Sequence, residues 1–146
     1  MKLLDANILL YAFNQDAAQH AVCRAWLEEA LNSEELVALP WQTLLAFVRI
    51  TTNSKAFRRP LQNAQACEIV SGWLSRPNVR VIEAGERFWE ILRGQVIEAQ
   101  VSGSLVSDAA LAALAIEQGA DMVSVDRDFR RFRGLRLIDP AETANR

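Results

Sequence analysis

The sequence is poor in the residue types on which several common kinds of functional site depend. It has one histidine, two cysteines and two lysines among its 146 residues. The cysteines, Cys23 and Cys67, form no CxxC pair, so neither a zinc knuckle nor a disulfide framework is expected. The single histidine, His20, cannot build a histidine-rich metal site. No GxxxxGKS, GxxxxGKT or GxGxxG pattern is present, which argues against nucleotide sites made by glycine-rich loops.

Long apolar runs are also missing. No run approaches the roughly 20 residues that a membrane span needs, so we expect no membrane association. The first five residues already include the acidic Asp5, which is atypical of a signal peptide, and we expect a cytoplasmic protein. With 51% hydrophobic residues, the chain has the composition and length of one globular domain. We therefore expect a single domain over residues 1–146, with 139–146 as a tail.

The charge is nearly balanced at −2, but almost all basic residues are arginine. Five of them fall within ten residues near the C-terminus: Arg127, Arg130, Arg131, Arg133 and Arg136. Guanidinium groups suit phosphate oxygens, so this cluster is a candidate for contacts with a phosphate backbone. From charge alone, a solvated basic face or a site for a partner protein explains the cluster at least as well.

Short apolar segments alternate with longer amphipathic ones along the chain. The short segments predict strands at 3–4, 36–39, 79–82, 122–125 and 135–138. The longer segments predict helices at 17–32, 41–52, 61–75, 85–100 and 105–119. Short apolar strands between helices predict an α/β fold, a three-layer α/β/α domain whose short-stranded central sheet is mainly parallel.

Four aspartates converge on one edge of this predicted sheet. Asp5 ends the first strand, Asp126 ends the fourth and Asp128 follows it by two residues. Asp108 lies at the N-terminus of the helix before the fourth strand, where Ser107 or Asp108 itself is expected to cap the helix. Carboxylates that converge raise one another's pKa unless a cation compensates their charge. Carboxylate oxygens are ligands that Mg²⁺ and Mn²⁺ prefer, so the pattern predicts a divalent metal site.

Each acid also has a simpler explanation when it is taken alone. In these explanations, Asp108 is a helix cap, Asp5 is a turn residue, and Asp126 and Asp128 belong to a solvated loop. A phosphoaspartate mechanism also places acids at strand ends, but it needs a late lysine, and no lysine follows Lys55. The arrival of all the acids at one sheet edge favours the metal site.

Three segments, in this order and at these spacings, resemble the PIN-domain ribonucleases, and most closely the VapC toxins of toxin–antitoxin modules. They are LLDANILLYA at 3–12, LVSDAALAALA at 105–115 and SVDRDF at 124–129. The resemblance covers essentially the whole chain. It implies a PIN-like fold and a Mg²⁺-dependent endoribonuclease, with Mn²⁺ as a substitute ion, that hydrolyses RNA phosphodiester bonds directly. It also implies a cognate antitoxin that inserts a segment into the active-site groove.

The resemblance assigns roles to individual residues. The catalytic, metal-binding acids are Asp5, Asp108 and Asp126, and Asp128 matches a frequent supporting acid. The supporting polar residues are Asn7 and Ser124, and RNA contacts fall to Arg127, Arg130, Arg131 and Arg133. Members usually dimerise, so a homodimer is implied. Of the four tryptophans, Trp26, Trp41, Trp73 and Trp89, most are expected in the core and some at an interface.

One position departs from the family pattern. Many members carry a glutamate on the second main helix, in a stretch like Ala-Glu-Phe-Val-Arg, whereas this chain has Ala46 there. The departure leaves two readings of the metal site: it holds one ion rather than two, or it uses Asp128 for the missing acid. It also keeps open an alternative function, a degenerate PIN domain that binds an antitoxin or RNA without cleaving.

Overall fold

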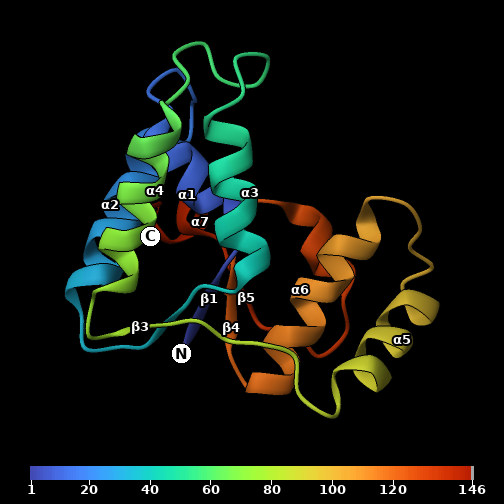
Figure 1. The fold of residues 1–146 in the computed structure, drawn as a ribbon. Helices are drawn as coiled ribbons and strands as arrows, with labels where there is room; N and C mark the ends of the chain where they lie inside the picture. Colours follow the sequence, from blue (N-terminus) through green and yellow to red (C-terminus); the bar gives the residue numbers. More distant parts are fainter. Residues whose placement is uncertain (146) are drawn as a thin grey trace.

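A five-stranded parallel sheet forms the centre of the computed structural model, which describes residues 1–145. The strands are β1 (Lys2–Leu4), β2 (Val37–Ala38), β3 (Val79–Arg80), β4 (Asp121–Val123) and β5 (Leu137–Ile138). Their order across the sheet is β3-β2-β1-β4-β5, and all four neighbouring pairs are parallel (Figure 1). The predicted short-stranded parallel sheet is confirmed.

Residues 1–145 also form seven α-helices and one 3-10 helix, and all of them except the last in the chain connect strands. They are α1 (Ala6–Phe13), α2 (His20–Asn32), α3 (Trp41–Thr51), α4 (Asn63–Leu74), α5 (Phe88–Glu98), α6 (Leu105–Gln118), α7 (Pro140–Thr143) and η1 (Arg127–Arg131). The five predicted helices correspond to α2 to α6, and four of them carry one tryptophan each. The expectation that most tryptophans lie in the core is wrong: only Trp73 is buried, Trp26 is partly buried, and Trp41 and Trp89 are exposed. Within residues 1–145, no helix combines the length and the apolar character that a membrane crossing requires.

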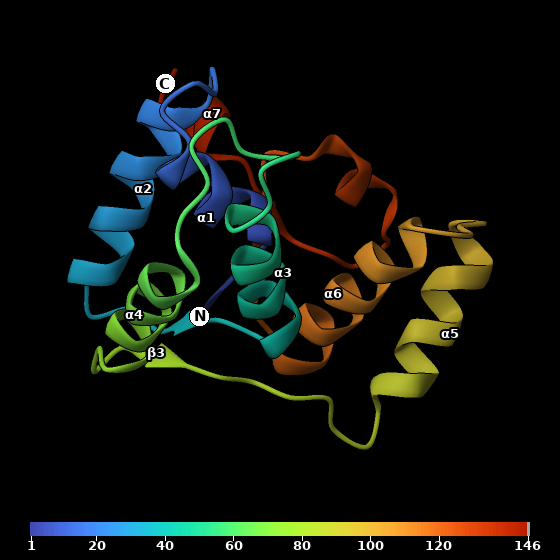
Figure 2. The same ribbon diagram turned by 45° about the horizontal axis from the view of Figure 1, so that its top comes forward.

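The sheet is covered on both faces, because successive strand residues point to opposite sides. In β1, Leu4 packs into a core formed with α1, α2, α3 and α4, whereas Leu3 packs into a second core formed with α5, α6 and η1. In β4, Val123 and Met122 divide between the same two cores. Figure 2 shows the two helical layers, with α1, α2, α3 and α4 on one side and α6 and α5 on the other. The three-layer architecture is therefore confirmed.

Two segments differ from the expectation. Residues 6–13 form α1, which no predicted helix covered. All of its eight residues except Asn7 are hydrophobic, and such a short apolar run does not by itself distinguish a helix from a strand. Residues 140–143, expected to belong to a tail, form α7. The Asp139 side chain caps this short helix by accepting a hydrogen bond from the Ala141 amide at 2.9 Å, and Pro140 is buried. The end of the described chain therefore packs against α2.

Helix α3 is attached to the end of β1 by a buried hydrogen bond. The hydroxyl of Thr43 donates to the backbone carbonyl of Leu4 at 2.8 Å, and Thr43 is 1% exposed. Because Leu4 directly precedes Asp5, this bond positions α3 beside the sheet edge at which the predicted acids meet.

Replacing this hydroxyl is expected to destabilise the fold. Thr43→Val keeps the shape but removes the donor to Leu4, and we expect the free energy of unfolding to fall by about 1–2 kcal/mol in urea titrations followed by circular dichroism. Thr52→Val is the matched control, since its hydroxyl bonds within α3 to Val48. We expect the control to change stability by less than about 0.5 kcal/mol. Equal losses in the two variants would contradict a special role for the bond to β1.

Candidate metal centre

The pairing of β1 with β4 brings two distant parts of the chain to the same sheet edge. Leu4 stands opposite Val123 in the ladder, so Asp5 and Ser124, which follow them, leave the sheet side by side. The amide of Asp5 donates to the Val123 carbonyl at 3.0 Å, which continues the pairing to the first acid. Strand ends thus place Asp5 where the sequence predicted it, at the carboxyl edge of the sheet.

The buried hydroxyl of Ser124 connects three groups at this edge. It donates to Asp5 Oδ2 at 2.8 Å and accepts from Asn7 Nδ2 at 2.9 Å and from the backbone amide of Asp126 at 3.0 Å. A serine hydroxyl offers one donor and two acceptor positions, and all three are used here. Ser124 is fully buried, so this network orients Asp5, Asn7 and the turn that begins at Asp126.

The turn after β4 carries the next two acids. Asp126 lies three residues beyond the end of β4 and caps η1, because its Oδ1 accepts a hydrogen bond from the Asp128 amide at 2.9 Å. Asp128 is more exposed, and its Oδ1 accepts from Arg131 at 3.0 Å. This local geometry holds the Asp126 and Asp128 carboxylates on one short turn.

Helix α6 supplies the fourth acid. The helix begins at Leu105, the first residue of the predicted segment, and Ser104 precedes it, so the expected cap at Ser107 or Asp108 is wrong and Asp108 is the fourth helical residue. One carboxylate oxygen from each of Asp108, Asp126 and Asp128 lies within 4.8 Å of the other two. Helix α6 and the turn after β4 thus bring Asp108 together with Asp126 and Asp128, which lie 18 and 20 residues further along the chain.

Asp5 borders this trio without belonging to it. Its carboxylate accepts the hydrogen bond from Ser124 and is repelled by the negative charge of Asp126. Burial raises the pKa of Asp5 above its ordinary value; the hydrogen bonds from Ser124 and from the start of α1 lower it, and the Asp126 charge raises it. The predicted set of Asp5, Asp108 and Asp126 is thus found at one edge, and Asp128, rather than Asp5, shares the close trio with Asp108 and Asp126.

The electrostatics of the group call for a positive charge. Burial, together with the charges of Asp5, Asp126 and Asp128, raises the pKa of Asp108 to about 6. The buried Oδ1 of Asn7, in the same network, accepts no hydrogen bond from residues 1–145. Carboxylate oxygens a few ångströms apart, with a neighbouring amide oxygen to spare, form a donor set that fits a hard divalent cation.

Helix α3 contributes an unexpected contact but no acid. Gln42, which the sequence did not single out, donates from Nε2 to the carbonyl of Ser107 at 3.0 Å, directly before Asp108. Ala46 lies one helical turn after Gln42 on the same face of α3, and its methyl group offers no ligand. In the sequence, the only indication that Gln42 lies near the acids is its position four residues, or one helical turn, before Ala46.

The arginines near the C-terminus divide into two groups. Arg131 pairs with Asp128, Arg130 with Glu142 and Arg136 with Asp121. Arg127 and Arg133 are exposed and have no carboxylate partner within residues 1–145. Of the four predicted RNA contacts, Arg127 and Arg133 are therefore the two whose charge is uncompensated in the described part of the chain.

The chain is similar to known proteins along almost its whole length. The PIN-domain family model matches residues 2–135. The chain is 41% identical over 140 residues to "Ribonuclease VapC37" of Mycobacterium tuberculosis, covering 96% of this chain and 97% of that protein. It is 36% identical over 142 residues to "Ribonuclease VapC43" of the same species, with 97% of each chain covered.

Solved structures share the fold at lower identity. One is the crystal structure of VapBC2 from Rickettsia felis bound to a promoter DNA fragment, with a TM-score of 0.68 and 20% identity over 94% of this chain and 97% of that one. Another is Mycobacterium tuberculosis VapC20, described as a sarcin-ricin loop cleaving toxin, with a TM-score of 0.63 and 18% identity over 93% of this chain and 99% of that one. These two matches support the fold.

The raised pKa of Asp108 predicts how stability depends on pH without metal. The folded state binds this proton more tightly than the unfolded state, so the contribution is complete below pH 3.8 and is lost as pH rises through about 6. Allowing for solvent screening of a partly exposed group, we expect a loss of about 1–2 kcal/mol in urea titrations with EDTA.

Variants and metal addition identify the source of this loss. Asp108→Asn should flatten the profile between pH 4 and pH 7, whereas Asp16→Asn, in an exposed loop, should leave it unchanged. Mg²⁺ at pH 7 should restore stability to the native sequence and less to Asp108→Asn. A native profile in Asp108→Asn would contradict the coupling among the four acids.

Proposed function

The chain belongs to the PIN-domain family, among the VapC ribonucleases, and from that premise we propose that it hydrolyses RNA phosphodiester bonds at the acidic edge of its sheet with Mg²⁺ as the cofactor. The observation that carries this proposal is the convergence of Asp108, Asp126 and Asp128, with Asp5 beside them. A PIN match along residues 2–135 and ribonuclease relatives at 36–41% identity support it.

In this proposal, Asp5, Asp108 and Asp126 hold the cation. When bound, the cation supplies an activated water and stabilises negative charge on the reacting phosphate. Ser124 and Asn7 orient Asp5, and the backbone of Asp126 shares the same hydroxyl. We assign Asp128 the place of the acid that α3 lacks at Ala46, since its carboxylate meets those of Asp108 and Asp126.

Arg127 and Arg133 are proposed to contact the RNA backbone. Both are exposed and, unlike Arg130, Arg131 and Arg136, have no carboxylate partner within residues 1–145. Phosphate contacts supply much of the affinity of a protein for nucleic acid and position the strand. These two guanidinium groups are therefore available to RNA phosphates.

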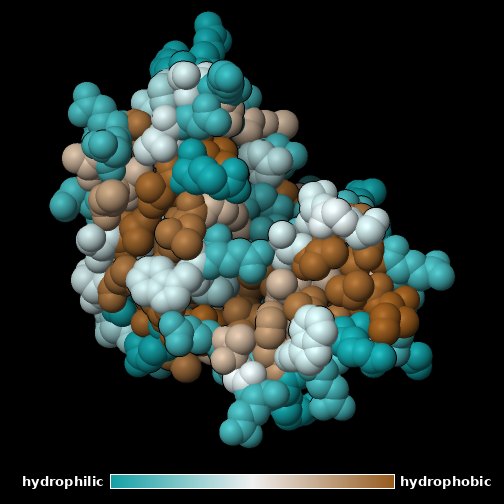
Figure 3. Space-filling model, turned by 45° about the vertical axis from the view of Figure 1, so that its right-hand side comes forward, coloured by the Kyte–Doolittle hydropathy of each residue, from teal (hydrophilic) through white to brown (hydrophobic). Residues whose placement is uncertain are grey.

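We further propose two protein partners, a cognate antitoxin and a second copy of this chain. The antitoxin is supported by solved relatives that are toxin–antitoxin complexes, including one from Klebsiella pneumoniae. The second copy is supported by large apolar side chains that are exposed on three helices: Trp41 and Leu45 on α3, Trp89 and Ile97 on α5, and Val106 on α6. Figure 3 shows apolar surface on both lobes of the face that it turns forward. Sedimentation as a monomer at micromolar concentration would refute the dimer.

A second function remains open because of Ala46: a PIN domain that binds RNA or an antitoxin without cleaving. The two functions differ in metal dependence. Failure of the well-folded protein both to cleave RNA and to bind Mn²⁺ would favour the binding function. Binding of Mn²⁺ together with discrete cleavage would favour the ribonuclease.

Removing single carboxylates is expected to abolish cleavage of a structured RNA pool by purified, antitoxin-free protein. Cleavage should require Mg²⁺ or Mn²⁺ and stop with EDTA. Asp5→Asn and Asp126→Asn should each lower the rate by at least about 100-fold while the circular dichroism spectrum is kept, because each removes negative charge that holds the cation. Asp128→Asn should also lower the rate, if Asp128 replaces the missing acid.

The control for these variants is Asp16→Asn, which changes an exposed loop carboxylate outside the acidic group. It should cleave at the native rate. Fragments that persist unchanged in both Asp5→Asn and Asp126→Asn would count against the assigned site. A native rate in Asp128→Asn alone would remove Asp128 from the metal ligands but leave the other three in place.

The two uncompensated arginines should matter more for RNA binding than those already in ion pairs. In the cleavage-deficient Asp5→Asn background, Arg127→Ala and Arg133→Ala are each expected to weaken binding about three- to tenfold. Each should also reduce the slope of log K against log salt by about 1 in fluorescence anisotropy titrations. Arg136→Ala, whose guanidinium is engaged by Asp121, is the control. An equal effect in the control would show that overall charge, not position, governs binding.

A further inference from the structure

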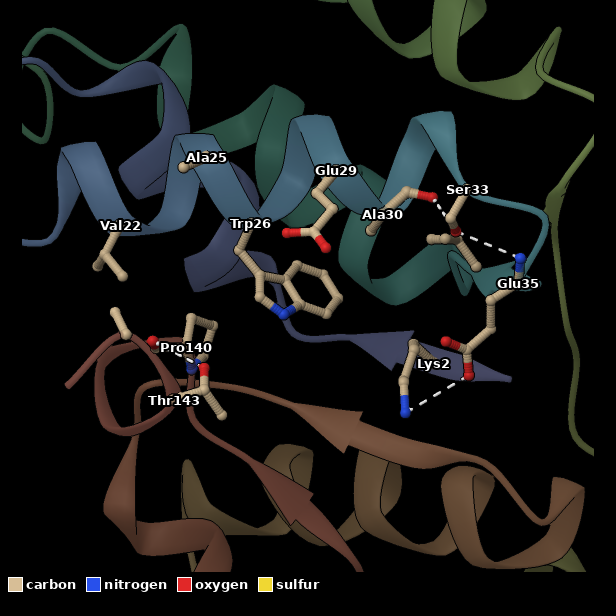
Figure 4. A pocket seen from close by; sticks show the side chains of 12 residues that line it. Lys2, Val22, Ala25, Trp26, Glu29, Ala30, Ser33, Glu35, Pro140 and Thr143 are labelled. Carbon is tan, nitrogen blue, oxygen red and sulfur yellow. Dashed lines mark hydrogen bonds and ion pairs between the residues drawn. The ribbon is translucent and has the colours of Figure 1, made fainter. Parts of the chain in front are cut away.

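A pocket of about 480 Å³ lies between α2 and α7, away from the acidic edge (Figure 4). Lys2, which begins β1, contributes to its wall, whereas Asp5 follows the other end of that strand. Helix α2 provides Trp26 and Glu29, and α7 provides Pro140 and Thr143. The volume falls within the range of pockets that hold small ligands or anchoring side chains. The ribonuclease site makes no use of this pocket.

The charges that line the pocket leave negative charge in excess. Lys2 is already paired, with Asp121 at 2.9 Å and with Glu35 at 3.4 Å. Glu29 makes no hydrogen bond and no ion pair with any of residues 1–145, and Figure 4 shows its carboxylate beside the Trp26 ring. A ligand with a positive group is therefore favoured, and a phosphate-bearing ligand such as RNA is disfavoured.

Trp26 gives the pocket an aromatic wall. Its ring packs in part against the core of α1 to α4, and Figure 4 shows the indole extending from α2 into the space above β1. Within the described residues its N–H donates no hydrogen bond. A planar cation stacks well on an indole face, particularly when a carboxylate lies beside it.

The pocket is also divided along its length. Val22 and Pro140 form an apolar end, whereas Lys2 and Glu35 lie at the other end, with Trp26 between them (Figure 4). A ligand that fills it needs an aliphatic group next to a cationic one. An arginine beside a leucine-like residue in a polypeptide meets this need, whereas a small cation alone leaves the apolar end empty.

We propose that this α2–α7 pocket binds an arginine side chain of a polypeptide partner. The guanidinium lies against the Trp26 indole and faces the Glu29 carboxylate. A neighbouring aliphatic side chain of the partner contacts Val22 and Pro140. This site is separate from the acidic edge, and it stands or falls independently of the ribonuclease activity.

The test uses two dipeptides that differ only in charge. Acetyl-Leu-Arg-amide and its neutral isostere acetyl-Leu-citrulline-amide are titrated into ¹⁵N-labelled protein, and the indole N–H signal of Trp26 is followed, with Trp26→Phe used to assign it. The arginine dipeptide should shift this signal with saturation. The citrulline dipeptide should bind about three- to tenfold more weakly. No shift, or equal affinities, would overturn the proposal.

Two neighbouring variants give a matched pair. Glu29→Gln should remove the preference for arginine over citrulline, whereas Glu28→Gln should keep it, since Glu28 pairs with Arg24 and lines a different cavity. Both positions are exposed on α2, so neither change is expected to disturb folding. Equal effects of the two variants would overturn the assignment of Glu29. Binding of n-butylguanidinium as tight as that of the dipeptide would overturn the polypeptide in favour of a small cation.

Discussion

Repulsion among four carboxylates is the constraint on which the functional edge of this protein depends. Burial and the charges of its neighbours raise the pKa of Asp108 to about 6, so the protein holds together groups that would separate in water. The restraint comes from the surrounding fold: the parallel pairing of β1 with β4, the buried Ser124 hydroxyl and the capped turn at Asp126. The fold keeps the carboxylates close together even when no cation is bound. Because a bound cation relieves their repulsion, this relief contributes to the free energy of cation binding.

The architecture and the general place of the site could be predicted, because both follow from local patterns. Short apolar runs that end in Asp5 and Asp126 predict buried parallel strands, and such strands deliver their following residues to one edge. Helix α1 escaped prediction because a short, almost wholly apolar segment directly after a strand does not by itself distinguish a helix from a continued strand. The cap of α6 was assigned too late in the chain because Ser107 and Asp108 are as suitable for capping as Ser104.

The details within the site depend on contacts that no local pattern contains. The Asp5 carboxylate accepts a hydrogen bond from Ser124, which is 119 positions away in the chain. The three carboxylates that lie closest together are those of Asp108, Asp126 and Asp128. The arginines show the same limit, since only the fold decides that Arg130 meets Glu142 and Arg136 meets Asp121 while Arg127 stays uncompensated. Composition counts charges, whereas tertiary structure determines which of them are available to a ligand.

The hydrogen bonds of Ser124 also impose a direction on the network. Both of its acceptor positions are filled by N–H groups, which can only donate, from Asn7 and from the backbone of Asp126. The single hydroxyl proton is therefore donated to Asp5 Oδ2. That oxygen accepts the Ser124 proton, and the same carboxylate also takes hydrogen bonds from the backbone of Ala6 and Asn7. The serine thus gives the network a fixed direction: Asp5 meets a donor at every internal contact, so the protein orients its ionised form before any cation arrives.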